Sequence, residues 1–205
     1  MDIEQSHILI ACATYFIATV SPGPANISIM EIAATKGRKP ALIFAVGVLL
    51  GSLVWAILAI LGVATMLSAH NNLLYFFKIL GGIYLFWLSC KSIKKVIFKE
   101  QVLSNNDLVN KKLFFQGLAL HITNPKAIFT WVVIVTLALP SDNISYAMSL
   151  NIVFACMALG ILVFGGYAII FSTTKAQVAY RKFSKWLNGI AAVMFGTAGY
   201  KLLTS

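Results

Sequence analysis

The stretch "SPGPANISIM", residues 21–30, interrupts a long apolar run with two prolines and a glycine. Proline has no backbone N–H and clashes with the carbonyl four residues earlier, so Pro22 and Pro24 release the carbonyls of Ala18 and Val20 from their helical hydrogen bonds. Unpaired carbonyls are costly in hydrocarbon but are tolerated where they line a cavity. Taken alone, the stretch predicts either a simple kink satisfied by neighbouring helices, which is the favoured interpretation of one break, or a broken membrane helix beside a cavity. A corresponding second break would favour the cavity.

Composition identifies the solvent around most of the chain. Of 205 residues, 60% are hydrophobic and 11% are charged, whereas an average soluble domain has about 25% charged residues. This balance predicts a membrane protein. The net charge of +10 comes from lysines clustered beside apolar segments and shows no RNA-reading pattern, so we expect no nucleic-acid partner. The three cysteines show no CxxC spacing, which indicates neither a disulfide framework nor a zinc site.

The apolar stretches are long enough for six membrane spans, since each span needs about 20 mostly apolar residues. The expected spans are Ile8 to Met30, Ala41 to Leu67, Leu73 to Cys90, Leu113 to Leu139, Ile144 to Phe171, and Trp186 to Leu203. The first is kept as a span because "MDIEQSH" is acidic where a signal peptide would be basic. The predicted fold class is an all-α membrane protein.

Basic residues alternate between the connections and set the orientation. Thirteen of the sixteen Lys and Arg residues follow the first, third or fifth span. Cytoplasmic loops carry such an excess of basic residues, so both termini should face away from the cytoplasm. The expected location is the cell inner (plasma) membrane. The largest connection, about 91–112, should be a basic cytoplasmic loop in contact with anionic lipid.

The chain also reads as two halves within one transmembrane domain. Pro22 and Pro125 are about 103 residues apart, and "KILGGIYLFWLSCK" resembles "LNGIAAVMFGTAGYK". Three spans in each half force the halves, about 7–90 and 113–205, to be inverted relative to each other. Inverted repeats with interrupted helices at corresponding positions are typical of secondary transporters.

A second break is expected in "HITNPKAIF", residues 121–129. Asn124 and Lys126 are about 200° apart on a regular helix, so they can share a cavity only if the helix unwinds at Pro125. Lys126 lies deep in the span, where an ammonium group costs roughly 3 kcal/mol on insertion scales. The break would supply the polar surroundings that this ammonium needs.

Three further polar residues are candidates for a coupling or cavity role. Lys78 either lines the cavity or extends to the membrane interface. His121 is either a proton carrier or a hydrogen-bonded core histidine, and the core reading is favoured. Asn151 either lines the cavity or joins two helices. "GVLLG", residues 47–51, is a close-packing pattern more typical of internal packing than of a dimer, and a homo-oligomer is left open.

Enzyme and nucleotide-binding signatures are missing: there is no GxSxG, HExxH or GxxxxGK[ST] sequence. We therefore expect no catalytic residues, no metal and no cofactor. Without an ATP site, any transport must use an ion or solute gradient.

The motifs resemble those of the LysE/RhtB superfamily of amino-acid exporters. The resemblance rests on "SPGPANI", "GVLLGSLVW", "FKILGGIYLFWLS" and "FFQGLALHITNPKAIFTW" and covers nearly the whole chain. It implies six spans and efflux of amino acids or related small metabolites, driven by protons or by exchange with a counter-solute. The residues that match the family motifs are Pro22, Gly23, Pro24, Asn124, Pro125 and Lys126. The family often has Asn directly after PGP, whereas Ala25 intervenes here, which weakens a direct binding role for Asn26.

The resulting hypothesis is that the two breaks bind a zwitterion. Half-helices starting after Pro24 and Pro125 would direct N–H donors and positive dipole ends at a carboxylate, with added charge from Lys126. The carbonyls freed at Ala18, Val20 and His121 would then bind the ammonium group. The alternatives are efflux of another solute such as a metal cation, and a non-transporting membrane scaffold or sensor.

Overall fold

The computed structural model describes residues 3–21, 23–62, 106–138 and 146–204, and scattered positions between 79 and 97. Every element within these ranges is a helix. The helices are α1 (Ile3–Val20), α2 (Pro24–Lys36), α3 (Arg38–Ile60), α6 (Asn106–Ile122), α7 (Pro125–Ala138), α8 (Tyr146–Ile170) and α9 (Thr174–Thr204). The all-α fold class expected from the sequence is confirmed for this part of the chain.

Two of the expected spans are broken helix pairs. The pair α1 and α2 bends by 54°, and the pair α6 and α7 bends by 56°. Pro24 begins α2 and Pro125 begins α7, a position where proline is favoured because its missing N–H is not needed. The two breaks therefore correspond through Pro24 and Pro125. The expected pairing of Pro22 with Pro125 is shifted by two residues, and Pro22 itself lies outside the described residues.

Within the described residues, α3 and α8 are long and apolar enough to cross a membrane, and each broken pair is a further span if it is taken as one unit. Most of the third expected span, from Leu73 to Cys90, lies outside the described residues. The sixth lies within α9, which starts at Thr174 rather than near Trp186. Helix α6 starts at Asn106, inside the expected loop.

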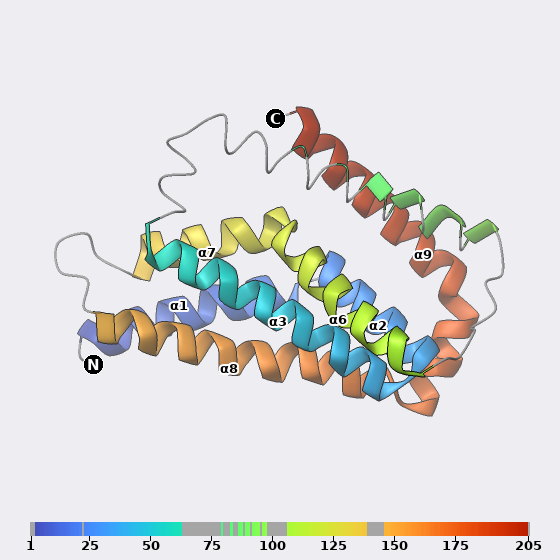
Figure 1. Ribbon diagram of the computed structural model, residues 1–205, viewed down its shortest axis with the longest axis horizontal. Helices are drawn as coiled ribbons and strands as arrows, with labels where there is room; N and C mark the ends of the chain where they lie inside the picture. The colour runs from blue at the N-terminus through green and yellow to red at the C-terminus, as the bar shows by residue number, and fades with distance from the viewer. Residues whose placement is uncertain are drawn as a thin grey trace.

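Glycines determine how closely the first half packs against the second. A Cβ at Gly47 would collide with the Phe114 carbonyl, and one at Gly117 would collide with the Phe44 carbonyl. A Cβ at Gly51 would lie 2.8 Å from His121 Cβ. The backbones of α3 and α6 therefore touch, and the expectation that "GVLLG" serves internal packing is confirmed. On the other side of α3, α8 packs against both α3 and α1 (Figure 1).

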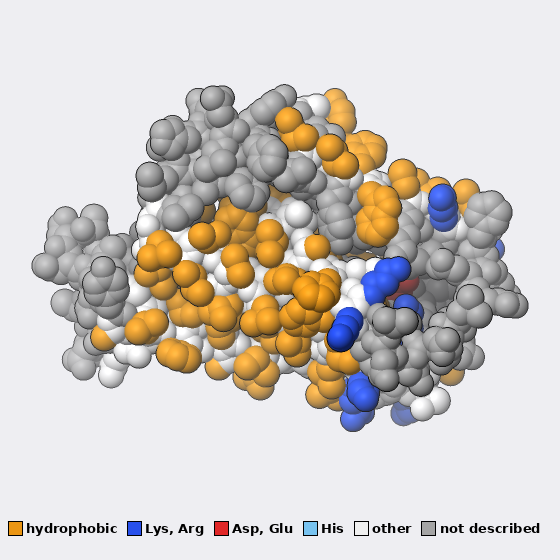
Figure 2. All heavy atoms as spheres, in the orientation of Figure 1, with side chains coloured by type: hydrophobic (Ala, Val, Ile, Leu, Met, Phe, Trp, Pro, Cys, Tyr) orange, Lys and Arg blue, Asp and Glu red, His pale blue; other side chains and the backbone are white. Residues whose placement is uncertain are grey.

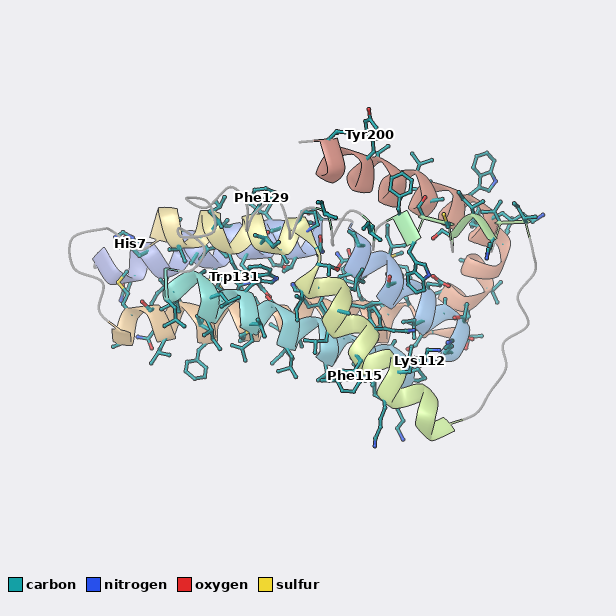
Figure 3. The ribbon with its side chains drawn as sticks, turned by 45° about the horizontal axis from the view of Figure 1, so that its top comes forward. His7, Lys112, Phe115, Phe129, Trp131 and Tyr200 are labelled. Atoms are coloured by element: carbon teal, nitrogen blue, oxygen red, sulfur yellow. The ribbon has the colours of Figure 1, made fainter. Side chains whose placement is uncertain are left out.

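The described surface is apolar along the bundle and basic at one end. Large apolar side chains are exposed along its length, including Ile17, Phe154 and Leu162. Figure 2 shows orange apolar side chains across the middle of the face in view. Exposed basic side chains gather at the end where α2 meets α3 and where α6 begins; they include Lys36, Arg38, Lys39, Lys111 and Lys112. Figure 3 labels Lys112 at this basic end and His7 at the opposite end.

Candidate functional site

A polar cavity lies where the two broken helices meet. Its volume is about 30 Å³, which is room for one or two water molecules. Helices α1, α2, α3, α6, α7 and α8 all contribute to its wall. The lining residues are Tyr15, Ala18, Thr19, Gly23, Ala25, Asn26, Ser52, His121, Asn124, Lys126, Ala127, Thr130, Trp131 and Phe164.

Lys126 joins the second break to the first. Its Nζ donates to the Ser21 carbonyl at 2.7 Å and contacts Ser21 Oγ at 2.6 Å. A cation is favourable there because the C-terminal end of α1 carries carbonyls that lack helical N–H partners and the negative end of the helix dipole. Two of the three ammonium protons are used by Ser21, so one remains for another partner. The side chain therefore points into the bundle, toward the first break, and lines the cavity.

Gly23 leaves space for this lysine. A Cβ at Gly23 would lie 3.2 Å from Lys126 Nζ and 3.4 Å from its Cδ. The Gly23 backbone is extended, with φ −167°, a conformation open to any residue. The missing side chain at Gly23 therefore gives room to Lys126, and the backbone there does not require glycine.

Protein donors already occupy the carbonyls released at the end of α1. Asn26 Nδ2 donates to the carbonyls of Thr19 at 2.7 Å and Ser21 at 3.1 Å. The Ser21 hydroxyl donates to Ala18 O at 3.0 Å, and the Tyr167 hydroxyl donates to Val20 O at 3.0 Å. The sequence-based hypothesis assigned the carbonyls of Ala18 and Val20 to a ligand's ammonium group, whereas the structure gives each a protein partner.

The second break is closed in a different way. Asn124 Oδ1 accepts the backbone N–H of Lys126 at 3.1 Å, and its main-chain carbonyl accepts from Ala127 at 3.0 Å. Asn124 is thus the N-cap of α7, and the donors expected at this helix start are used internally. At the end of α6, His121 O accepts from the N–H of Asn124 at 3.2 Å.

Ile122 O, also at the end of α6, accepts from Trp55 Nε1 of α3 at 3.1 Å. This indole was not found from the sequence, where Trp55 reads as one more apolar residue of a span.

The hydrogen bonds fix which polar groups remain for a ligand. In α2, the backbone N–H groups of Ala25 and Asn26 donate to no other described residue. Because Asn26 Nδ2 faces two carbonyls, its Oδ1 must be the atom left over, and it accepts from no described residue. By the same logic, Asn124 leaves its Nδ2 donor unused within the described chain. The groups available to a ligand are therefore the N–H donors of Ala25 and Asn26, the Nδ2 donor of Asn124, and one acceptor, the Oδ1 atom of Asn26.

Three aromatic and hydroxyl side chains that sequence reasoning missed form another part of the wall. Trp131 Nε1 donates to Ser52 Oγ at 3.0 Å, and the Tyr15 hydroxyl lies 3.0 Å from the same oxygen. The rings of Tyr15 and Trp131 are 5.5 Å apart. Figure 3 shows Trp131 between α7 and α3, while Phe129 points away from the bundle. We call Tyr15, Ser52 and Trp131 the hydroxyl cluster.

The remaining candidates are placed as follows. His121 is buried in the cavity wall beside Phe164, and its Nδ1 has no hydrogen-bond partner among the described residues. The sequence favours a hydrogen-bonded core histidine at this position. The structure places His121 in the core, but its Nδ1 makes no hydrogen bond to a described residue. Asn151 is exposed on α8 and does not line the cavity. Lys78 lies outside the described residues.

Fold and site together define a helical integral membrane protein with a polar cavity at two mid-helix breaks, an arrangement suited to moving a small polar solute. Comparison with known families gives the same class. Residues 16–205 match the LysE type translocator family, and the chain belongs to that family, which transports solutes and is not enzymatic.

Similar proteins cover almost the whole chain. A threonine efflux protein of Salmonella typhimurium is 28% identical over 196 residues, spanning 93% of this chain and 94% of the relative. A threonine efflux protein of Escherichia coli strain K12 is 26% identical over 201 residues, spanning 96% of this chain and 97% of the relative. An uncharacterized membrane protein of Haemophilus influenzae is 24% identical over 187 residues, spanning 88% of each chain. No solved structure matches this chain.

Proposed function

We propose that this protein exports amino acids or closely related small metabolites, and that the cavity between the two breaks is the substrate site. The observation that carries the proposal is the ammonium of Lys126 in the wall of a cavity inside the bundle, beside the N-terminus of α2, which has no side-chain cap. The relatives named for threonine efflux support a small amino acid as the cargo.

The carboxylate of the substrate binds at the N-terminus of α2. The backbone N–H groups of Ala25 and Asn26 have no described acceptor, and the positive end of the α2 dipole adds to their attraction for an anion. Lys126 Nζ lies beside Gly23, directly before this helix, and has one proton free. The Asn124 Nδ2 group lines the same cavity and offers a further donor.

The ammonium of the substrate binds at Asn26 Oδ1. This atom is the one side-chain acceptor of the two cavity asparagines that no described residue uses, and its orientation is fixed by the two carbonyls that hold Nδ2. Asn26 therefore has a direct role through its oxygen, although Ala25 separates it from the PGP sequence.

Binding must be coupled to movement of the two breaks. A cavity of about 30 Å³ holds one or two waters but not an amino acid. The contact between Lys126 and Ser21 closes the cavity, since it joins α7 to the end of α1. A carboxylate competes with Ser21 for this ammonium, so substrate entry would release the contact and let the breaks separate.

The proposed membrane arrangement has six spans in two inverted repeats, with protons or a counter-solute as the driving partner. The bends of 54° and 56° at corresponding prolines support this symmetry. The exposed basic end of the bundle, which lies opposite the end that carries His7, supports a cytoplasmic location for the basic residues and outside termini. In a cysteine-free background, Gln5→Cys should react with an impermeant maleimide on intact cells, and Lys175→Cys should react only after permeabilisation.

The function is tested by efflux of radiolabelled threonine from proteoliposomes. Wild-type protein should produce saturable flux above that of empty vesicles, and Lys126→Met should abolish it. Lys185→Met, which removes an exposed lysine on α9, is the matched control and should retain flux. If Lys126→Met exports at the wild-type rate, the cavity is not the transport site. If wild-type protein moves no amino acid, the proposed function itself is wrong.

A further inference from the structure

One titratable side chain in the cavity wall has a ring nitrogen without a hydrogen-bond partner. His121 is 6% exposed and lines the cavity at the end of α6. Its Nδ1 is buried and has no partner among the described residues. Its Cβ lies against Gly51 of α3, and its ring meets that of Phe164 edge-on, with centroids 6.0 Å apart. Buried polar atoms are nearly always paired, so an unpaired nitrogen in a cavity wall indicates a group that a ligand completes.

His121 is also the residue of the described wall that is suited to carry a proton. The titratable side chains there are Tyr15 on α1, His121 on α6 and Lys126 on α7, while α2, α3 and α8 contribute none. Tyr15 belongs to the hydroxyl cluster, where its hydroxyl pairs with Ser52 Oγ. The ammonium of Lys126 is held by Ser21. Histidine is the side chain whose charge ordinarily changes near neutral pH, so it can gain and lose a proton at the pH of a cell.

The charge of Lys126 determines the state of His121 while the cavity is closed. Both side chains line a space of about 30 Å³, and two positive charges so close together are unfavourable. The ring is therefore neutral while the ammonium of Lys126 contacts Ser21, and a neutral imidazole offers one lone pair. A proton reaches this lone pair when the breaks separate and water enters.

The ammonium group of a substrate competes with a proton for the same lone pair. The site proposed above places this ammonium at Asn26 Oδ1, which uses one of its three protons and leaves two. Asn26 and His121 line the same cavity, so a second of these protons is available to the ring nitrogen. A protonated imidazole has no lone pair left, and its charge repels the ammonium. The proton and the substrate therefore exclude each other at His121.

We infer that His121 couples export to proton entry by binding in turn a proton and the ammonium group of the substrate. This inference rests on the proposed export function and identifies the residue that links it to an ion gradient. Substrate that binds from the cytoplasm displaces the proton from His121 into the cytoplasmic water. After the substrate leaves on the other side, a proton from that side takes its place. Each cycle moves one zwitterion out and one proton in.

The first test is uphill uptake by acid-loaded proteoliposomes, with the membrane potential clamped by potassium and valinomycin. When the lumen is one pH unit more acid than the outside, wild-type protein should accumulate labelled threonine up to about tenfold, the limit for one proton per substrate. His121→Asn keeps an amide oxygen that accepts from the ammonium but cannot bind a proton. At equal pH it should still exchange labelled for unlabelled threonine, and it should fail to accumulate threonine when the lumen is acid.

The matched control is His7→Asn. The Nδ1 of His7 is also buried without a partner among the described residues, but His7 does not line the cavity. This variant should accumulate threonine as the wild type does, because its histidine is remote from the proposed exchange.

The second test counts protons in weakly buffered detergent solution. Addition of threonine to wild-type protein should release protons at some pH between about 5 and 7, where histidine is partly protonated. The His121→Asn protein should bind threonine and release none. This measurement needs no gradient, so it reports the competition at His121 separately from transport.

The outcomes separate coupling from transport. Wild-type protein that exchanges threonine but neither accumulates it nor releases protons overturns the coupling and leaves the export function standing. Accumulation by His121→Asn at the wild-type level also overturns the coupling. Wild-type protein that exchanges no threonine overturns the export function and this inference with it. If His121→Asn does not fold, His121→Gln replaces it, and the accumulation and proton release of the wild type still decide whether protons are exchanged.

Discussion

The two helix breaks are alike in backbone and different in chemistry. Both start a half-helix at a proline and bend the chain by nearly the same angle, 54° and 56°. At the first break, a glycine without a side chain precedes Pro24, and the N–H groups of Ala25 and Asn26 have no acceptor among the described residues. At the second, Asn124 caps α7 and uses its first donors.

This difference assigns separate tasks to the two breaks. The first break keeps donors available and gathers polar side chains around the end of α1, so it is suited to holding a charged ligand. At the second break, the Asn124 cap and the Trp55 indole pair the backbone groups that the break exposes. This break also supplies the ammonium group of Lys126, which contacts Ser21 at the first break. A symmetric backbone therefore carries an asymmetric site.

After the loss of Lys126 itself, the largest effect is expected when the second break is given a negative charge. Asn124→Asp keeps the N-cap of α7, because aspartate caps as well as asparagine, but it replaces the Nδ2 donor with a carboxylate oxygen that competes for Lys126. We expect at least tenfold slower threonine efflux with an unchanged melting temperature. Asn124→Ser, which also caps but adds no charge, should be impaired less. Equal flux in Asn124→Asp and wild type would remove Asn124 from the site.

A smaller effect is expected from filling the space at the first break. The Cβ of Gly23→Ala would lie 3.2 Å from Lys126 Nζ, so the flexible lysine must shift by a few tenths of an ångström away from Ser21. We expect severalfold slower efflux. The control is Gly165→Ala on α8, where a Cβ meets nothing within 4 Å. If both alanine variants export alike, the packing of Lys126 over Gly23 has no part in transport.

The smallest effect on transport is expected at the structural side of the second break. Trp55→Phe removes the donor to Ile122 O, and a buried carbonyl without its partner costs about 1–3 kcal/mol. The melting temperature in detergent should fall, while the rate of efflux per folded molecule should change little. A selective loss of efflux at unchanged stability would show that the second break also binds substrate.

Sequence patterns predict the breaks better than the groups that complete them. Pro24, Pro125 and Lys126 are visible because prolines and a lysine are out of place in an apolar span. The roles of Tyr15, Ser52 and Trp131 depend on three helices meeting, and each residue is ordinary within its own segment. The same reason applies to the Val20 carbonyl, whose partner, the distant Tyr167, becomes apparent only in the packed structure. The partner of the Ala18 carbonyl is local, because it is the hydroxyl of Ser21 three residues along the chain.

The most direct test of the central claim is competition between an amino acid and its amide. Unlabelled threonine and threonine amide have similar shapes and both carry the ammonium group, but only the acid offers a carboxylate to Lys126 and to the N-terminus of α2. With wild-type protein in proteoliposomes, the acid should inhibit efflux of labelled threonine at concentrations at least tenfold lower than the amide. Equal inhibition by acid and amide would contradict the account, because the charge and the open donors at the first break would then have no role in binding substrate.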